Sequence, residues 1–406
     1  MRIIWMTCML ALVGSCLGLA AAEPNVAYAT PEMYGAKGDD GKDDTEALKK
    51  LFSEKHGKTI FIPAKEYLIS DTVVLPKRSG MRVQGVSSGV QYLGQKKGLM
   101  GNMSRLVWIG GKDKPMVEYR GSGLIWDGVA LHGKRSHETK ERASIGFLVH
   151  KVSKGIGTGK ALFNQISIFH CDTGFQVGTR EGEGNCDLLI FNFFNVGACD
   201  VGYRVKNNMG MDHSFVFARS YGCKTFFYFE RGGSIYVHSA GVHHPDNKEL
   251  LRIGWAGKNN AKYTFGNLKF DAQLTEFRFV IMEQPVPAFI TLTNLKRSFH
   301  YEKDKATGTH RVHSKYDRTG TFVLQGNAKL LIKNCSGVIT KHCILATSGL
   351  PENNKAEDPA TPLVLIENSE VSGDPSELLH PDSDKSTRLR VLNCFDYSGN
   401  WVEDKR

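Results

Sequence analysis

The chain repeats itself between residues 164 and 230, in the segments Cys171-Asp-Thr-Gly-Phe175-Gln-Val177, Cys199-Asp-Val-Gly-Tyr203-Arg-Val205 and Cys223-Lys-Thr-Phe-Phe227-Tyr-Phe229. The leading cysteines of these segments lie 28 and 24 residues apart. Each unit combines short apolar runs of the β type with turn residues and shows no helical periodicity. A unit of this length cannot bury its apolar face alone, so the pattern indicates coils that stack on one another.

The repeat predicts an all-β fold, a single-stranded right-handed parallel β-helix with a short N-terminal capping helix. The units are too short for a strand with a crossover helix, which excludes helical solenoids. Stacked coils place equivalent residues about 4.8 Å apart. We therefore expect Cys171, Cys199 and Cys223 to form an inward-facing ladder. The handedness follows from the rule for crossovers between parallel strands.

Two further patterns predict ladders at the turns of the coils. Apolar runs followed by asparagine and a small residue recur at Asn334, Asn368 and Asn393, whose amides would stack and satisfy backbone groups. Asp187 and Asp212 lie 25 residues apart, and each opens an apolar run. This alignment predicts that Asp212 stacks on Asp187 at a turn.

Residues 1–22 have the layout of a secretory signal peptide, with Arg2 before a short apolar run and Ala20-Ala21-Ala22 at the end. The interpretation predicts a protein that is secreted, periplasmic or bound to the cell surface. Cys16 offers an alternative, because Val13-Gly-Ser-Cys16 resembles a bacterial lipoprotein cleavage site. No later segment approaches the roughly 18 apolar residues of a membrane-spanning helix, so none is predicted.

Seven of the nine cysteines remain after residue 22, and an odd number in an oxidising compartment leaves at least one thiol unpaired. We expect burial in the core rather than a disulfide framework. The spacing of cysteine and histidine matches no structural metal site, so no metal ligand is predicted.

The chain divides into the signal segment 1–22, a cap segment 23–58 and a β-helix domain 59–406. In the cap, a helix is predicted over residues 44–55, with Asp43 and Glu46 forming a capping box. Strands are predicted at 59–62 and 67–75. Polar excursions from the coils are expected at three places, near residues 87–103, 133–143 and 296–320.

The segment 33–75 resembles the N-terminal part of the pectate lyase superfamily, whose members are pectin-lyase-like right-handed parallel β-helix proteins. The matching residues are Tyr34, Gly35, Ala36, Gly38, Asp39, Asp43, Asp44, Thr45, Ala47, Pro63 and Tyr67. Lys65-Glu66 departs from the family, which often has glycine before the tyrosine. The acidic residues of this segment are interpreted as structural. The motif is specific for the fold and says little about chemistry, because the fold hosts several activities.

The resemblance implies a carbohydrate substrate. The net charge of +10 favours an acidic polysaccharide as partner of an exported protein, rather than nucleic acid. A polysaccharide lyase needs a base and a cation, either Ca²⁺ or arginine, that neutralises the uronate carboxylate. A glycoside hydrolase needs two carboxyl groups across the scissile bond. The signature motifs of polygalacturonases and of Ca²⁺-dependent pectate lyases are absent from the sequence.

Candidate site residues come from consecutive middle coils and from the basic excursion 296–320. The predicted catalytic residues are Asp212, His213, Arg219 and His243, and the predicted substrate-binding residues are His238, His244, Arg311, His313 and Lys315. In the lyase hypothesis Arg219 neutralises the substrate carboxylate, and His213 or His243 takes the proton. Each also has a structural interpretation: a coil corner for His213, a polar loop for His243 and His244, and an ion pair for Arg219.

Two alternatives stay open. The carboxylates Asp271, Glu276 and Glu283 would serve a glycoside hydrolase on the same scaffold. A non-catalytic carbohydrate-binding surface protein would keep the solenoid without an active site. The basic composition favours the lyase over the hydrolase. The missing signature motifs favour the non-catalytic protein, and the clustered histidines and arginine of the middle coils favour an enzyme.

Overall fold

The computed structural model describes the following residues: 28–54, 59–76, 80–89, 103–134, 141–150, 158–179, 185–207, 210–244, 246–255, 261–270, 277–297, 301–303, 310–312, 321–348, 361–371, 374–396 and 399–402. The predicted signal segment lies outside them. So does most of each predicted excursion. None of the helices in the described part of the chain has the length and apolarity needed to cross a membrane.

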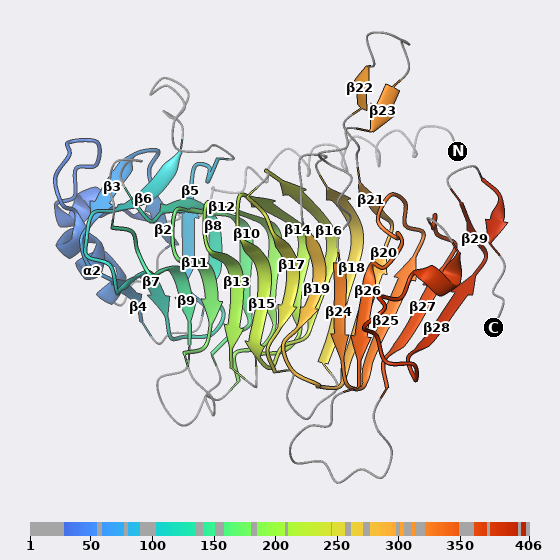
Figure 1. The fold of residues 1–406 in the computed structure, drawn as a ribbon. Coiled ribbons are helices and arrows are strands. Elements are labelled where there is room, and N and C mark those ends of the chain that lie inside the picture. Colours follow the sequence, from blue (N-terminus) through green and yellow to red (C-terminus); the bar gives the residue numbers. More distant parts are fainter. Residues whose placement is uncertain are drawn as a thin grey trace, which may run out of the picture.

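Two long parallel sheets form the walls of a right-handed parallel β-helix (Figure 1). Sheet A contains, in spatial order, β1 (Tyr28–Ala29), β2 (Thr59–Ile62), β5 (Arg82–Gly85), β8 (Ile125–His132), β10 (Ala161–Phe169), β12 (Leu189–Gly197), β14 (His213–Tyr221), β16 (Ile235–His243), β18 (Ala261–Phe270), β20 (Ala288–Thr293), β25 (Ala328–Lys333), β27 (Leu363–Glu367) and β28 (Arg388–Leu392). Beside this path, β3 (Glu66–Ile69) pairs with β6 (Ser104–Trp108), β6 with β8, and β21 (Leu295–Arg297) with β18.

Sheet B contains β4 (Val73–Leu75), β7 (Pro115–Tyr119), β9 (Ile145–Val149), β11 (Thr173–Val177), β13 (Val201–Lys206), β15 (Thr225–Arg231), β17 (Glu249–Ile253), β19 (Arg278–Met282), β24 (Thr321–Gln325) and β26 (Ile344–Thr347). From β7 to β20 successive strands alternate between the sheets, so each coil contributes one strand to each. Two antiparallel pairs, β22 (Tyr301–Lys303) with β23 (His310–Val312) and β29 (Cys394–Phe395) with β30 (Trp401–Val402), lie outside the two sheets.

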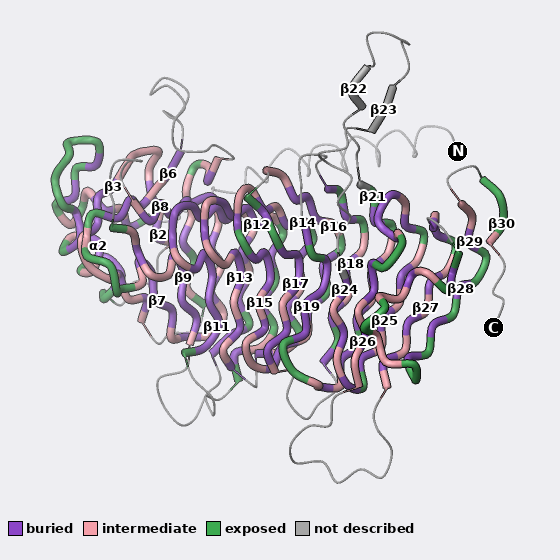
Figure 2. The backbone as a smooth tube through the Cα atoms, viewed as in Figure 1, coloured by how far each residue is buried: buried purple, intermediate pink, exposed green. Residues whose placement is uncertain are grey.

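Aromatic side chains from successive coils stack inside the solenoid. Phe163, Phe191 and Phe215 form one column beneath sheet A, with ring centroids 4.8 and 4.5 Å apart. Phe175 of sheet B meets Phe163 edge to face at 5.1 Å. Buried and more exposed residues alternate along strands such as β25 and β27, whereas all five residues of β11 are buried; Figure 2 shows the burial along the chain.

The predicted cysteine ladder is confirmed. Cys171, Cys199 and Cys223 are buried, and each lies two residues before the registered positions Thr173, Val201 and Thr225. All seven cysteines beyond residue 22 are buried and none forms a disulfide, so burial rather than a disulfide framework accounts for them.

The predicted stacking of asparagines at a turn is also confirmed, because the three residues directly follow the registered positions Lys333, Glu367 and Leu392. Asn334, Asn368 and Asn393 all have φ near +50°, a left-handed conformation that asparagine tolerates. The amide of Asn334 stacks on Asn294, and that of Asn294 on Asn267, so the ladder continues into coils where it was not predicted.

The predicted alignment of Asp212 with Asp187 is wrong by one residue. Ile190 pairs with Ser214, so Asp212 stacks on Leu188, and both have left-handed φ angles of 58° and 57°. Asp187 instead accepts a hydrogen bond from the backbone N–H of Met211 at 3.1 Å.

At the N-terminal end, α2 (Thr45–Ser53) follows the 3₁₀ turn η1 (Pro31–Tyr34) and packs against η1 and β4. A second 3₁₀ turn, η4 (Pro375–Glu377), lies near the C-terminus. The predicted capping box is wrong: Asp43 accepts from Thr45 at 2.9 Å, while Glu46 pairs with Lys49 on the exposed side of the helix. The single strand predicted over 67–75 divides into β3 and β4 at a corner.

Candidate functional site

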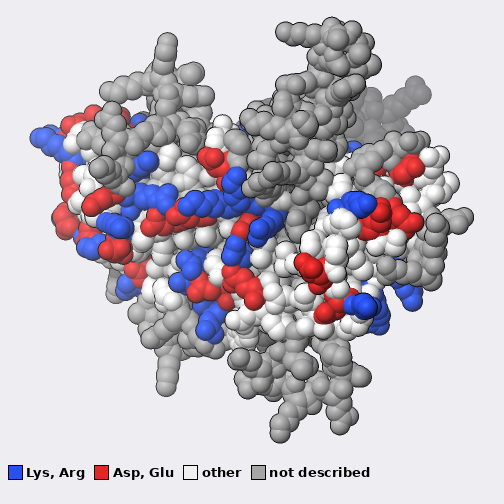
Figure 3. Space-filling model, viewed as in Figure 1, with Lys and Arg blue, Asp and Glu red and all other residues white. Residues whose placement is uncertain are grey.

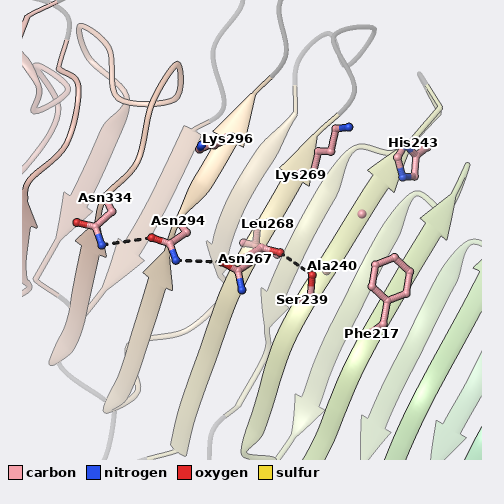
Figure 4. Close-up of a pocket in the computed structure, with 11 residues that line it drawn as sticks. Phe217, Ser239, Ala240, His243, Asn267, Leu268, Lys269, Asn294, Lys296 and Asn334 are labelled. Carbon is pink, nitrogen blue, oxygen red and sulfur yellow. Dashed lines mark hydrogen bonds between the residues drawn. The ribbon is translucent and has the colours of Figure 1, made fainter.

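A pocket of ≈ 730 Å³ opens on the outer face of sheet A, over β14 to β25 (Figure 4). Its lining residues are Phe217, Ser239, Ala240, Gly241, His243, Asn267, Leu268, Lys269, Asn294, Lys296 and Asn334. Five consecutive coils contribute to it, so the pocket extends along the solenoid axis rather than along one strand. At about 4.8 Å per coil, the distance from the first strand to the last is about 19 Å.

The strand register places cations in one line. Arg219 pairs with Gly241 on the next strand, Gly241 with Lys269, and Lys269 with Lys296. Their chain neighbours Ala218, Leu268 and Leu295 are buried, so these side chains face outward. We call Arg219, Lys269 and Lys296 the cation row.

The cation row has no counterions among the described residues. Nε of Arg219 is buried and has no hydrogen-bond partner. On sheet B, by contrast, two arginines are neutralised: Arg204 donates to Glu230 at 2.8 Å, and Arg252 to Glu283 at 2.7 Å. Figure 3 shows basic and acidic side chains intermixed on the face in view. Unpaired cations in a pocket raise the local positive potential and attract anions.

A second row of polar groups runs beside the cations. Asn334 donates to Asn294 at 3.2 Å, Asn294 to Asn267 at 3.0 Å, and Ser239 to the carbonyl oxygen of Asn267 at 3.3 Å (Figure 4). Each link of the ladder uses one N–H of a side-chain amide that has two. The three asparagines are exposed, so their second N–H groups can serve a bound ligand.

His243 lines the pocket from the end of β16, as Figure 4 shows. Its ring lies over Gly241, where an added Cβ would come within 2.6 Å of Nε2. Glycine at that position therefore leaves room for the imidazole. Histidine is the side chain most often used for proton transfer, so His243 is the candidate base of this pocket.

No aspartate or glutamate is present among the described residues that line the pocket. Glu283, one of the carboxylates considered for a hydrolase, lies directly after β19 on sheet B, where it accepts from Arg252 and from Tyr228 at 3.1 Å. Asp271 and Glu276 lie outside the described residues. Within the described chain, no group of three or more potential ligands could hold a metal ion.

The prediction of His213 as a catalytic base is wrong, because its side chain is fully buried inside the coil. Nδ1 lies 2.8 Å from Oη of Tyr203, and Nε2 lies 3.0 Å from the carbonyl oxygen of Cys186. Burial lowers the pKa of His213 to about 4. It is the first residue of β14 and faces inward, so a polysaccharide has no access to it.

The structure does not bring Asp212 to the pocket. Asp212 precedes β14, whereas Arg219 is near the other end of that strand, roughly 20 Å away at about 3.3 Å per residue. His238 is exposed at the middle of β16, and its carbonyl oxygen accepts from Asn267 at 3.5 Å. His244 follows β16 in a turn, with its ring 4.9 Å from that of Tyr221. Neither histidine lines the pocket.

The excursion 296–320 begins at the pocket, through Lys296. Within it, β22 and β23 pair as a hairpin that projects from the solenoid (Figure 1). Arg311 belongs to β23, but its side chain lies outside the description, as do His313 and Lys315. Their predicted role in substrate binding stays a prediction.

Sequence reasoning missed Lys269, Lys296 and the asparagines beside them. A signal exists: the tripeptide Asn-Leu-Lys occurs at 267–269 and again at 294–296, 27 residues apart. This spacing equals one coil, so it predicts that two asparagines and two lysines stack in pairs on the outer face.

No family model and no curated protein matches the sequence. Solved structures do. The A-module of the mannuronan C-5 epimerase AlgE4 from Azotobacter vinelandii has a TM-score of 0.50 and 15% identity, covering 91% of this chain and 95% of that one. A GH87 α-1,3-glucanase from Streptomyces thermodiastaticus has a TM-score of 0.51 and 12% identity, covering 95% and 71%. DFA-IIIase from Arthrobacter chlorophenolicus has a TM-score of 0.50 and 12% identity, covering 94% and 97%.

Fold and pocket together define a class: a right-handed parallel β-helix protein with a cationic pocket on one sheet. At 12–15% identity, the similarity to the epimerase, the glucanase and DFA-IIIase extends to the fold alone.

Proposed function

We propose that the protein is an exported enzyme that cleaves an anionic polysaccharide by β-elimination. The observation that carries the proposal is that two members of the cation row, Lys269 and Lys296, line a pocket together with His243, and that no carboxylate is among its described lining residues. Three β-helix structures of similar fold carry enzyme names, and two of these name a polysaccharide, mannuronan or α-1,3-glucan. That agrees with a carbohydrate substrate.

The proposed mechanism begins with an ion pair between a uronate carboxylate and Lys269 and Lys296. This ion pair withdraws electrons from the ring carbon next to the carboxylate. It thereby stabilises the negative charge that develops on that carbon when the carbon loses its proton. His243 takes that proton. The electron pair of the broken C–H bond forms a ring double bond, the glycosidic C–O bond breaks, and the leaving oxygen takes a proton.

A hydrolase fits these residues less well, because it needs an acid and a second carboxylate on opposite sides of the scissile bond. Glu283, which remains as a described candidate, points to the ion pairs of sheet B instead. A non-catalytic binder needs only the cation row and the asparagine ladder, so it stays an outcome of the test.

The test is a panel of polygalacturonate, alginate and sulfated glycans. A lyase produces both new reducing ends and the ultraviolet absorbance of an unsaturated sugar, a hydrolase produces reducing ends alone, and a binder produces neither. The same assay with a chelator tests whether Ca²⁺ also helps to neutralise the substrate carboxylate.

Variants then test the residues. Lys269→Ala should lower kcat/KM about 10²-fold, since it removes one charge from the developing anion, and His243→Ala should abolish the unsaturated product. Lys262→Ala is the matched control, because Lys262 is exposed on the same strand but does not line the pocket. Equal activity of all three variants would refute the assignment of these residues.

A further inference from the structure

The outer face of sheet A is open at one end of the cation row and covered at the other. Ser167 on β10 and Asn195 on β12 occupy the same outward register position as Arg219, yet they are 0% and 1% exposed. Further along the register, Lys269 and Lys296 are exposed. Arg219 lies at the boundary, with intermediate exposure.

Described residues account for the covered end. Ser88 contacts the outer face of the sheet at β10, where its Oγ lies 3.1 Å from Oγ of Ser167. Ser167 donates to the carbonyl oxygen of Gly89 at 2.7 Å, and Asn195 donates to Ser167 at 3.4 Å. The contacts of Ser88 and Gly89 cover Ser167 on β10, and Asn195 beside it on β12 is buried as well; we call this covered stretch, which ends one coil before Arg219, the wall.

A second observation concerns the charge at this wall. Arg219 has a buried Nε without a hydrogen-bond partner, and no described carboxylate pairs with its guanidinium. Arginine stays charged and presents its donors in a planar fork that matches a carboxylate. At the closed end of the groove, the guanidinium of Arg219 can therefore bind one anionic substituent of a ligand.

We infer that the groove binds the terminus of an anionic glycan and not the interior of a chain. This rests on the proposed function, which supplies the anionic glycan. Arg219 holds the last charged sugar against the wall, and Lys269 and Lys296, about 10 and 14 Å further along, together hold the carboxylate at the proposed site of cleavage. A chain that lies on the cation row cannot continue past β12. The proposed enzyme is therefore exolytic and releases short products from polymer ends.

The experiment measures binding of charged oligouronides by calorimetry, in three forms: free at both ends, or with a bulky fluorophore at the reducing or at the non-reducing end. The expected result is that a fluorophore at one particular end abolishes binding, while the same group at the other end changes the Kd less than threefold. Equal binding of all three forms would overturn end recognition and leave the anionic substrate intact. Absence of binding by every form would overturn both proposals.

Chain length distinguishes the two binding modes further. If sugars fill the groove from the wall outward, Arg219→Ala weakens short and long oligosaccharides alike by about tenfold or more, and Arg219→Lys restores part of the affinity. Lys296→Ala weakens only oligosaccharides long enough to reach it. In an open groove short oligosaccharides could bind elsewhere along the row, so Arg219→Ala would spare them, and that result would contradict the inference.

Discussion

Two buried histidines illustrate how differently one residue type can be accommodated. His132 has no hydrogen-bond partner at either ring nitrogen and packs 5.4 Å from the ring of Phe169. His213 is bonded at both nitrogens. We expect His132→Leu to leave stability unchanged or raised, and His213→Leu to cost about 1–3 kcal/mol because it leaves buried partners unsatisfied. Denaturant midpoints of the two variants measure the difference, and equal losses would contradict it.

The same histidines predict acid sensitivity. Burial lowers the pKa of His132 to about 3 and that of His213 to about 4, from an ordinary value of 6.5. The unfolded chain therefore takes up these protons first. Their contribution to stability is complete above about pH 6.5 and is lost as the pH falls towards 4 and 3. His132→Leu should flatten the decline in the denaturant midpoint over this range; a decline as steep as in the unaltered protein would refute the assignment.

At the level of single residues, the sequence predicted position better than orientation. Arg219 and His243 were predicted to come from consecutive coils, and both lie on the outer face of sheet A. His213 was predicted as a catalytic residue or at a coil corner beside Asp212, and its inward orientation was not predicted, although neighbours on a strand face opposite sides. Which of them faces inward depends on the strand's start, and the alignment with Asp187 misplaced that start by one residue.

Among structural elements, the asparagine ladder requires both a left-handed backbone conformation and hydrogen bonds between side-chain amides. Asn294 has φ of 54° and is bonded to both Asn267 and Asn334. Asn294→Ala should cost about 1–2 kcal/mol, because alanine disfavours left-handed φ and the amide contacts are lost. Asn294→Gly loses the amide contacts but tolerates the backbone, so it should cost less. Thermal unfolding of both variants tests the order, and a glycine variant less stable than the alanine variant would contradict it.

The cysteine ladder predicts chemical inertness. Burial raises the pKa of Cys199 and of Cys223 well above the usual range, and only the thiolate reacts readily. Native protein should resist a maleimide reagent at neutral pH for hours, whereas protein in denaturant should react at all seven thiols beyond residue 22. Mass spectrometry counts the adducts. Rapid labelling of Cys171, Cys199 or Cys223 in the native state would contradict their interior position.

Elements that repeat were the ones that could be predicted. The Cys-Asp-x-Gly turn recurs at one-coil spacing, and the structure places it at one corner of the solenoid. The capping box failed because Asp43 and Ser70 hydrogen-bond to each other across 27 residues, a tertiary contact with no signal in the local pattern.

At the scale of the whole molecule, the closed end of the groove could not be predicted from the repeat. Ser88 meets Ser167 across 79 residues, and neither lies in a motif. The stacking of the coils determines which residues share a row on the outer face. Whether a ligand can reach that row depends on segments that leave the coils and pack against the sheet at another place. The repeat therefore predicts the scaffold, and tertiary contacts decide where a ligand can lie.

The N-terminal end of the solenoid provides the last prediction. β4 is the terminal strand of sheet B, and α2 packs against it through a face that includes the buried Leu51. Uncovered strand edges invite pairing with another chain. Leu51→Asp places a charge in this contact and should release the helix, so light scattering should detect concentration-dependent self-association. Lys50→Asp introduces the same residue at the exposed neighbouring position and should leave the scattering unchanged. If both variants scatter like the unaltered protein, α2 does not protect the edge.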